Sequence, residues 1–79
     1  MNHAKTLKPG APATKVLNVL RDAGSRGATS LEIQERAVVV APSTVISQLR
    51  HMGYGIRRMF ERVSESGAKV HRYWLVETT

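Results

Sequence analysis

The sequence predicts an α+β fold in which three helices are followed by a two-stranded antiparallel hairpin. Up to Met52, apolar residues recur every three or four positions, which is typical of amphipathic helices. After Gly53, strand-forming residues gather on both sides of a glycine-containing turn. A chain of 79 residues can bury one core of this kind and has no room for a second. The helices and the hairpin therefore belong to one domain.

The first thirteen residues are expected to form a flexible basic arm. They hold two lysines, two prolines and no acidic residue, and they can bury little apolar surface. The first helix is predicted from Thr14, which would serve as its N-cap, to Gly24, which suits a helix stop. Its buried side would be formed by Val16, Leu17, Val19 and Leu20. The domain is accordingly assigned to residues 14–79.

The second helix is predicted from a capping box. Thr29 and Glu32 stand three residues apart, so each side chain can accept a hydrogen bond from the backbone N–H of the other. The helix should end near Ala37, because the three valines that follow are stiff and Pro42 disfavours helical geometry in the residue before it. Residues 37–41 are interpreted as a turn, with one or two of the valines filling the core.

The third helix is predicted from Pro42 to about Met52. Proline suits the first helical turn, where its missing N–H is no loss, and Gly53 supplies the stop. The apolar side of this helix is made by Val45, Ile46, Leu49 and Met52. Uncharged polar side chains point the other way on a helical wheel: Thr44, Ser47, Gln48 and His51.

The hairpin is predicted over residues 56–63 and 69–76, joined by a turn at residues 64–68. Because side chains alternate along a strand, one face would cover the helices with Ile56, Phe60, Tyr73 and Leu75. The other face would hold Arg57, Met59, Glu61, Arg72, Trp74 and Val76.

An apolar patch is expected on that outer face, made by Met59, Trp74 and Val76. Two interpretations stay open. The patch is a surface for self-association, which would give a homodimer, or Trp74 folds under the N-terminal arm. The sequence favours neither.

The charge of the chain indicates a polyanionic partner. Its 12 lysines and arginines against 6 aspartates and glutamates give a net charge of +6, which makes nucleic acid the first hypothesis. The planar fork of arginine suits phosphate oxygens, whereas a merely solvated basic face is the alternative. The predicted phosphate contacts are Ser43, Arg36, Arg50, Arg57, Arg58, Arg62 and Lys69.

The polar side of the third helix is the candidate for reading bases. Short uncharged side chains can reach base edges, and the amide of Gln48 can pair with adenine through two hydrogen bonds. The predicted base contacts are Thr44, Ser47, Gln48 and His51. The alternative is that this row is an ordinary solvated helix surface, which is polar in any soluble protein.

Neither an enzyme nor a metal or cofactor site is expected. The chain has no cysteine, and its three histidines lack the mutual spacing of a zinc site. Ser43, Ser47 and His51 share a helix face, but no acidic partner completes a hydrolytic triad. No small-molecule ligand is indicated, since the chain has no glycine-rich phosphate loop. No apolar run approaches the roughly 20 residues of a membrane span, so a cytoplasmic protein without a membrane partner is expected.

Two short helices around a tight turn, followed by a basic hairpin, have the order of a winged helix-turn-helix. Residues 14–76 resemble small winged helix-turn-helix domains common in phage and prophage proteins. The segments that carry this resemblance are Thr29-Ser30-Leu31-Glu32, Ile46 with Leu49-Arg50, Gly53-Tyr54-Gly55-Ile56 and Arg72-Tyr73-Trp74-Leu75. The resemblance implies a regulator that binds duplex DNA with the helix ahead of the Gly-Tyr pair in the major groove.

The expected function is therefore sequence-specific duplex DNA binding by a transcriptional regulator of phage or mobile-element origin. The alternative from another class is a small winged-helix protein that binds and inhibits a host protein through its basic surface or its apolar patch. RNA binding is a third hypothesis, but the sequence lacks the aromatic pairs on which single-strand readers stack bases.

Overall fold

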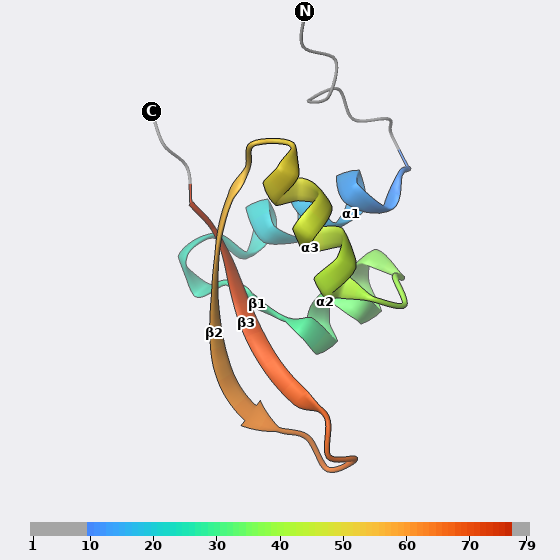
Figure 1. Cartoon of the computed structure of the whole chain (residues 1–79), viewed down its shortest axis with the longest axis vertical. Coiled ribbons are helices and arrows are strands. Elements are labelled where there is room, and N and C mark those ends of the chain that lie inside the picture. The colour runs from blue at the N-terminus through green and yellow to red at the C-terminus, as the bar shows by residue number, and fades with distance from the viewer. Residues whose placement is uncertain (1–9, 77–79) are drawn as a thin grey trace, which may run out of the picture.

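The computed structural model describes residues 10–76 and shows three helices lying on one side of an antiparallel sheet (Figure 1). The helices are α1 (Pro12–Ala23), α2 (Ser30–Ala37) and α3 (Pro42–His51), with a short 3-10 turn, η2 (Gly24–Arg26), after α1. The strands are β1 (Ala28–Thr29), β2 (Gly55–Val63) and β3 (Lys69–Val76). The predicted fold class, three helices followed by an antiparallel hairpin, is confirmed.

The sheet has one strand more than predicted. Its order is β1-β3-β2, and β1 pairs with β3 through Ala28 opposite Tyr73 and Thr29 opposite Arg72. A strand of two residues is too short to show alternation, so this strand could not be predicted from the sequence. This strand connects the start of α2 directly to the middle of the hairpin.

Helix α1 begins earlier than predicted. Its N-cap is Ala11 in an extended conformation and Pro12 occupies the first turn, so Thr14 lies inside the helix rather than at its cap. Ala13 is buried in the core, whereas residues 1–9 of the predicted arm lie outside the described residues. Gly24 ends the helix at a φ of 59°, as predicted.

Helix α2 begins at the predicted capping box. Oε1 of Glu32 accepts from the backbone N–H of Thr29 at 2.9 Å, and Oγ1 of Thr29 accepts from that of Glu32 at 3.1 Å. The helix ends at Ala37, and Val38 follows in the left-handed region with a φ of 54°. The prediction that one or two of the valines in the turn fill the core is confirmed for one of them, Val39, whereas Val38 and Val40 are exposed.

Helix α3 ends in a Schellman motif. The backbone N–H of Tyr54 donates to the carbonyl of Leu49 at 3.1 Å, and that of Gly53 donates to Arg50 at 3.0 Å. Gly53 has a φ of 103°, which glycine adopts without the strain of a Cβ. The chain therefore turns sharply from α3 into β2.

The core lies between the three helices and the sheet. Its largest fully buried side chains come from every helix: Val16, Leu17, Leu20, Ile33, Ile46 and Leu49. Ile56 and Tyr73 close it from the sheet, and Leu75 packs against it half-buried, as predicted. The prediction that Phe60 belongs to the core is wrong, because Phe60 is 52% exposed and its ring makes an edge contact with that of His71 in β3.

Candidate nucleic-acid interface

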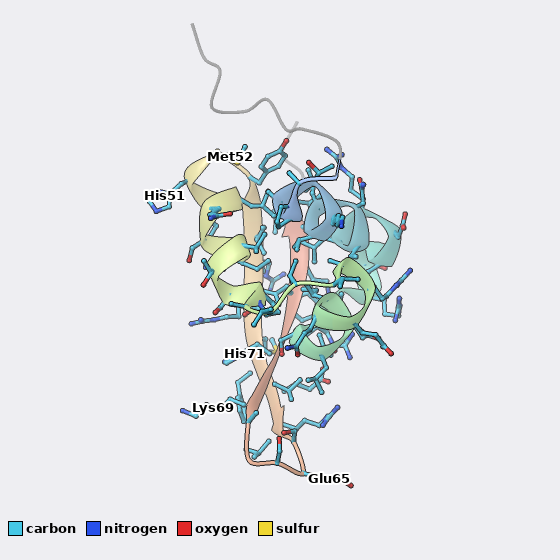
Figure 2. All side chains as sticks on the ribbon, turned by 90° about the vertical axis from the view of Figure 1, so that its right-hand side faces the viewer. His51, Met52, Glu65, Lys69 and His71 are labelled. Atoms are coloured by element: carbon cyan, nitrogen blue, oxygen red, sulfur yellow. The ribbon has the colours of Figure 1, made fainter. Side chains whose placement is uncertain are left out.

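The polar side of α3 faces solvent. Ser43, Thr44, Ser47, Gln48 and His51 are all exposed, while Val45, Ile46 and Leu49 on the other side are buried. In Figure 2, His51 projects outward from the end of this helix, away from the sheet. The helical wheel thus predicted the exposed side of α3 correctly.

A groove runs between the start of α3 and the hairpin. Residues from α2, the turn before α3, α3 itself and both long strands line it: Ser30, Val40, Ala41, Pro42, Ser43, Arg58, Lys69, His71 and Tyr73. None of these residues is acidic. Figure 2 shows Lys69 and His51 projecting to the same side of the molecule. Ser43 is exposed at the start of α3 and also lines the groove, so the groove and the exposed side of α3 adjoin and form one continuous surface.

Two of the predicted phosphate-binding cations lie in this groove. Arg58 stands opposite Tyr73 in the hairpin, on the face that turns toward the helices, and Lys69 begins β3 on the same face. Within residues 10–76, neither cation forms a hydrogen bond or an ion pair. Their charges are therefore not neutralised by any side chain of the described residues.

Two other predicted cations lie elsewhere. Arg57 points to the opposite face of the sheet, where its guanidinium carbon lies 5.9 Å from the centre of the Trp74 ring. Arg36 is exposed in the last turn of α2 and does not line the groove. The structure does not bring either of them to the start of α3.

Arg50 and Arg62 are also separate from the groove. Nε and Nη2 of Arg50 donate to the carbonyl of Ile56 at 3.3 and 2.8 Å, which ties the end of α3 to the first residues of β2. Arg62 lies near the tip of the hairpin and lines a second hollow with Leu31 of α2. Sequence proximity grouped these arginines, but the fold distributes them over several surfaces.

The outer face of the hairpin carries an ion pair. Nε of Arg72 lies 2.6 Å from Oε1 of Glu61, and Nη1 of Arg72 donates to the carbonyl of Arg26 at 3.0 Å. The hydrogen bond from Arg72 lowers the pKa of the Glu61 carboxyl and raises that of the guanidinium. Glu61 is the extra residue of a β-bulge, since Phe60 pairs with His71 while Arg62 pairs with Val70.

Trp74 is less exposed than predicted. Its side chain is half-buried, and its indole Nε1 donates to the carbonyl of Ser25 at 2.9 Å. The backbone of Gly27 approaches the same ring, because a Cβ there would lie 2.7 Å from Nε1. Trp74 therefore packs on the turn after α1, whereas Met59 and Val76 remain exposed. Self-association through this face stays a prediction.

Six residues of the groove were not among the predicted site residues: Ser30, Val40, Ala41, Pro42, His71 and Tyr73. Two of them, Ser30 and His71, come from distant parts of the sequence. The backbone N–H of His71 lies 3.4 Å from Oγ of Ser30, although 41 positions separate them. They meet because β1 pairs with β3, so detecting that short strand would have been the only signal. The ring of His71 also makes an edge contact with Phe60, with centroids 5.7 Å apart.

The described part of the chain holds no candidate metal site and no candidate membrane-spanning helix. Among residues 10–76 no three side chains of the metal-binding types lie close enough together to hold an ion. Over the same residues no helix has the length and apolar character needed to cross a bilayer.

The comparison with protein families agrees with the geometry. No significant match was found among curated proteins or among solved structures. A family model described as a winged helix-turn-helix domain matches residues 13–78, which include α2, the turn, α3 and the hairpin. Such domains are typically DNA-binding and non-enzymatic. The chain therefore belongs to the winged helix-turn-helix domain family.

Proposed function

We propose that this protein is a sequence-specific duplex-DNA-binding regulator of transcription. The observation that carries the proposal is the continuous surface made by the exposed polar side of α3 and the groove with Arg58 and Lys69. In the proposed complex α3 enters the major groove, and the hairpin lies along the neighbouring phosphate backbone.

The side chains of α3 suit base edges in type and position. Gln48 lies midway along the exposed side, and its amide both donates and accepts, as adenine in the major groove requires. Thr44 and Ser47 flank it with hydroxyls that can reach either a base or a phosphate. These residues are uncharged, so they would contribute to sequence preference more than to the total electrostatic attraction.

The groove cations suit the phosphate backbone. Arg58 and Lys69 have no anionic partner in the described chain, and binding a phosphate would give each of them one. The hydroxyl of Ser43 lies at the edge of the same groove and can donate to a phosphate oxygen. The proposal thus assigns base contacts to the polar side chains of α3, and phosphate contacts to Ser43 and the two cations of the groove.

Selection of bound fragments from random duplex DNA tests the proposal and identifies the preferred site. Gln48→Ala should weaken binding to that site by about 1 to 3 kcal/mol and leave non-specific binding nearly unchanged, because only a base contact is lost. Asn18→Ala removes an exposed amide from α1 and is the matched control, expected to bind like the parent. Equal binding by Gln48→Ala and the parent would show that α3 does not read DNA in this way.

The selected site also tests the assembly. A domain of this size covers few base pairs, so we expect two copies on a two-fold site with half-sites about one helical turn apart. Sedimentation of the protein alone and on its site measures this, and a single copy in both cases would contradict it. If no duplex is enriched and none is bound, the hypothesis of an inhibitor that binds a host protein replaces DNA regulation.

A further inference from the structure

Val40 is a large apolar residue at the proposed interface, on the groove that also holds the cations Arg58 and Lys69. Its side chain is 90% exposed, the highest value among the large apolar residues of the described chain. It also lines the groove, together with Ser43 and Arg58. Its neighbour Val39 is the valine that is buried in the core, so core packing does not explain why a valine stands at position 40.

The backbone holds Val40 in place. Nε2 of Gln34 donates to the carbonyl of Val40 at 3.3 Å, and the carbonyl of Gln34 accepts from the backbone N–H of Val39 at 3.3 Å. Val38 adopts a left-handed conformation that is uncommon for a β-branched residue. The valine side chain is thus presented from a turn that is fixed on the α2 side.

The turn is fixed on the other side as well. The carbonyl of Ala41 accepts from the backbone N–H groups of Thr44 and Val45 at 3.1 and 3.4 Å, which anchors it to the first turn of α3. Val40 therefore stays close to the leading end of the helix that would enter the major groove.

We infer that Val40 contacts the C5-methyl group of a thymine. This inference rests on the proposed function and names one base that the protein would prefer. The thymine methyl is the apolar group that base pairs present in the major groove, and small apolar side chains recognise it by contact. A docked protein is the less fitting occupant, because the apolar residues next to Val40, Ala41 and Pro42, are small and the cations Arg58 and Lys69 line the same groove.

The test replaces thymine with deoxyuridine, which removes only the methyl group. The probe is the duplex obtained by selection, with one thymine replaced at a time. The parent should bind about fourfold more weakly when the contacted thymine is replaced, as expected for the loss of one buried methyl group. Val40→Ala should bind the thymine and deoxyuridine duplexes equally at that position.

Val38→Ala is the matched control, since it shortens another exposed valine of the same turn that does not line the groove. It should keep the parent's fourfold preference. A preference that survives in Val40→Ala, or the absence of any thymine preference in the parent, would overturn the inference while leaving duplex binding intact. A parent that binds no duplex would instead overturn the proposed function, and this inference with it.

Discussion

The two faces of the β2–β3 hairpin carry the same kind of side chain in different surroundings. On the face that turns away from α3, Arg72 is paired with Glu61, and Arg57 lies over the ring of Trp74. On the face beside α3, Arg58 and Lys69 line the groove without an internal partner among residues 10–76. We call the outer face the closed face, because its arginines Arg57 and Arg72 already contact other side chains of the protein. We call the groove face the open face, because its cations have no such contact among residues 10–76.

This difference shows why a count of arginines does not locate a binding surface. Arg57 and Arg58 are consecutive, so strand alternation sends them to opposite faces. A guanidinium that already contacts a carboxylate or an aromatic ring has less to gain from a phosphate than one that has no partner. The open face is therefore where changes should affect DNA binding, and the closed face is where they should affect stability.

The largest loss of stability is expected from Gly27→Ala, which would disrupt the packing of Trp74 on the turn after α1. Gly27 has a φ of 73°, and an added Cβ would lie 2.7 Å from both Nε1 of Trp74 and the carbonyl oxygen of Tyr73. The left-handed backbone and the steric clash together should lower the free energy of unfolding by about 2 to 5 kcal/mol. Urea unfolding measures the loss.

Gly67→Ala is the control for that clash. Gly67 also has a positive φ, of 90°, but nothing lies within 4 Å of an added Cβ in the hairpin turn. It should lose only the conformational part, about 1 to 2 kcal/mol. Equal losses for the two variants would show that contact with Trp74 does not hold the closed face.

The next effect compares the neighbouring arginines of β2. Arg58→Ala should weaken binding to all duplexes about equally and reduce the salt dependence of log affinity by about one unit, because one phosphate contact is lost. Arg57→Ala should leave the salt dependence unchanged, since Arg57 lies on the other face. Fluorescence anisotropy titrations at several salt concentrations measure both. A reduced salt dependence in Arg57→Ala alone would reverse the assignment of the faces.

A smaller effect is expected from Trp74→Phe. The substitution keeps an aromatic ring beside Arg57 but removes the N–H that donates to the carbonyl of Ser25. The loss of one partly exposed hydrogen bond should lower the free energy of unfolding by about 1 kcal/mol, with duplex affinity unchanged. Thermal unfolding and binding to the selected duplex check both parts. Weaker DNA binding at full stability would mean that the outer face also contacts DNA.

Most of the fold could be predicted because its signals are local. The capping box at Thr29, the proline that begins α3 and the glycine that ends it each act within a few residues. The third strand, β1, could not be predicted, because its two residues form a strand only by pairing with β3, which is distant in the sequence. Strand alternation predicts which face of the sheet Phe60 lies on, but it does not predict whether other side chains cover that position.

The candidate site also has one part that could be predicted from the sequence and one part that could not. The exposed side of α3 follows from a helical wheel, so Gln48 and its neighbours could be identified from the sequence. The groove could not, because it joins Ser30, Arg58 and His71 from parts of the chain that meet only in the folded sheet. The hydrogen bond from Arg50 to the carbonyl of Ile56 could not be predicted either, because it depends on the sharp turn between α3 and β2.

The smallest expected effect concerns the ion pair of the closed face and appears in its pH dependence. The hydrogen bond from Arg72 holds the pKa of Glu61 below its ordinary value of 4.5. A carboxyl whose pKa is lowered by folding stabilises the folded state above its unfolded pKa, and this contribution is lost as the pH falls through the lowered pKa. Glu61→Gln should therefore be less stable than the parent at neutral pH.

The gap between Glu61→Gln and the parent should begin to narrow as the pH falls below the ordinary pKa of 4.5, because Glu61 of the unfolded parent then takes up a proton. It should close as the pH falls through the lowered pKa of the folded parent, where the carboxylate itself is protonated and the ion pair is lost. Glu32, whose pKa is also lowered, chiefly by the backbone N–H of Thr29, contributes acid sensitivity to both proteins, so their difference isolates Glu61. Urea unfolding at a series of pH values measures that difference. A gap that stays constant from neutral to acidic pH would mean that the charge of Glu61 does not help to hold the outer face closed, and that Arg72 is held there by the backbone carbonyls of the turn after α1.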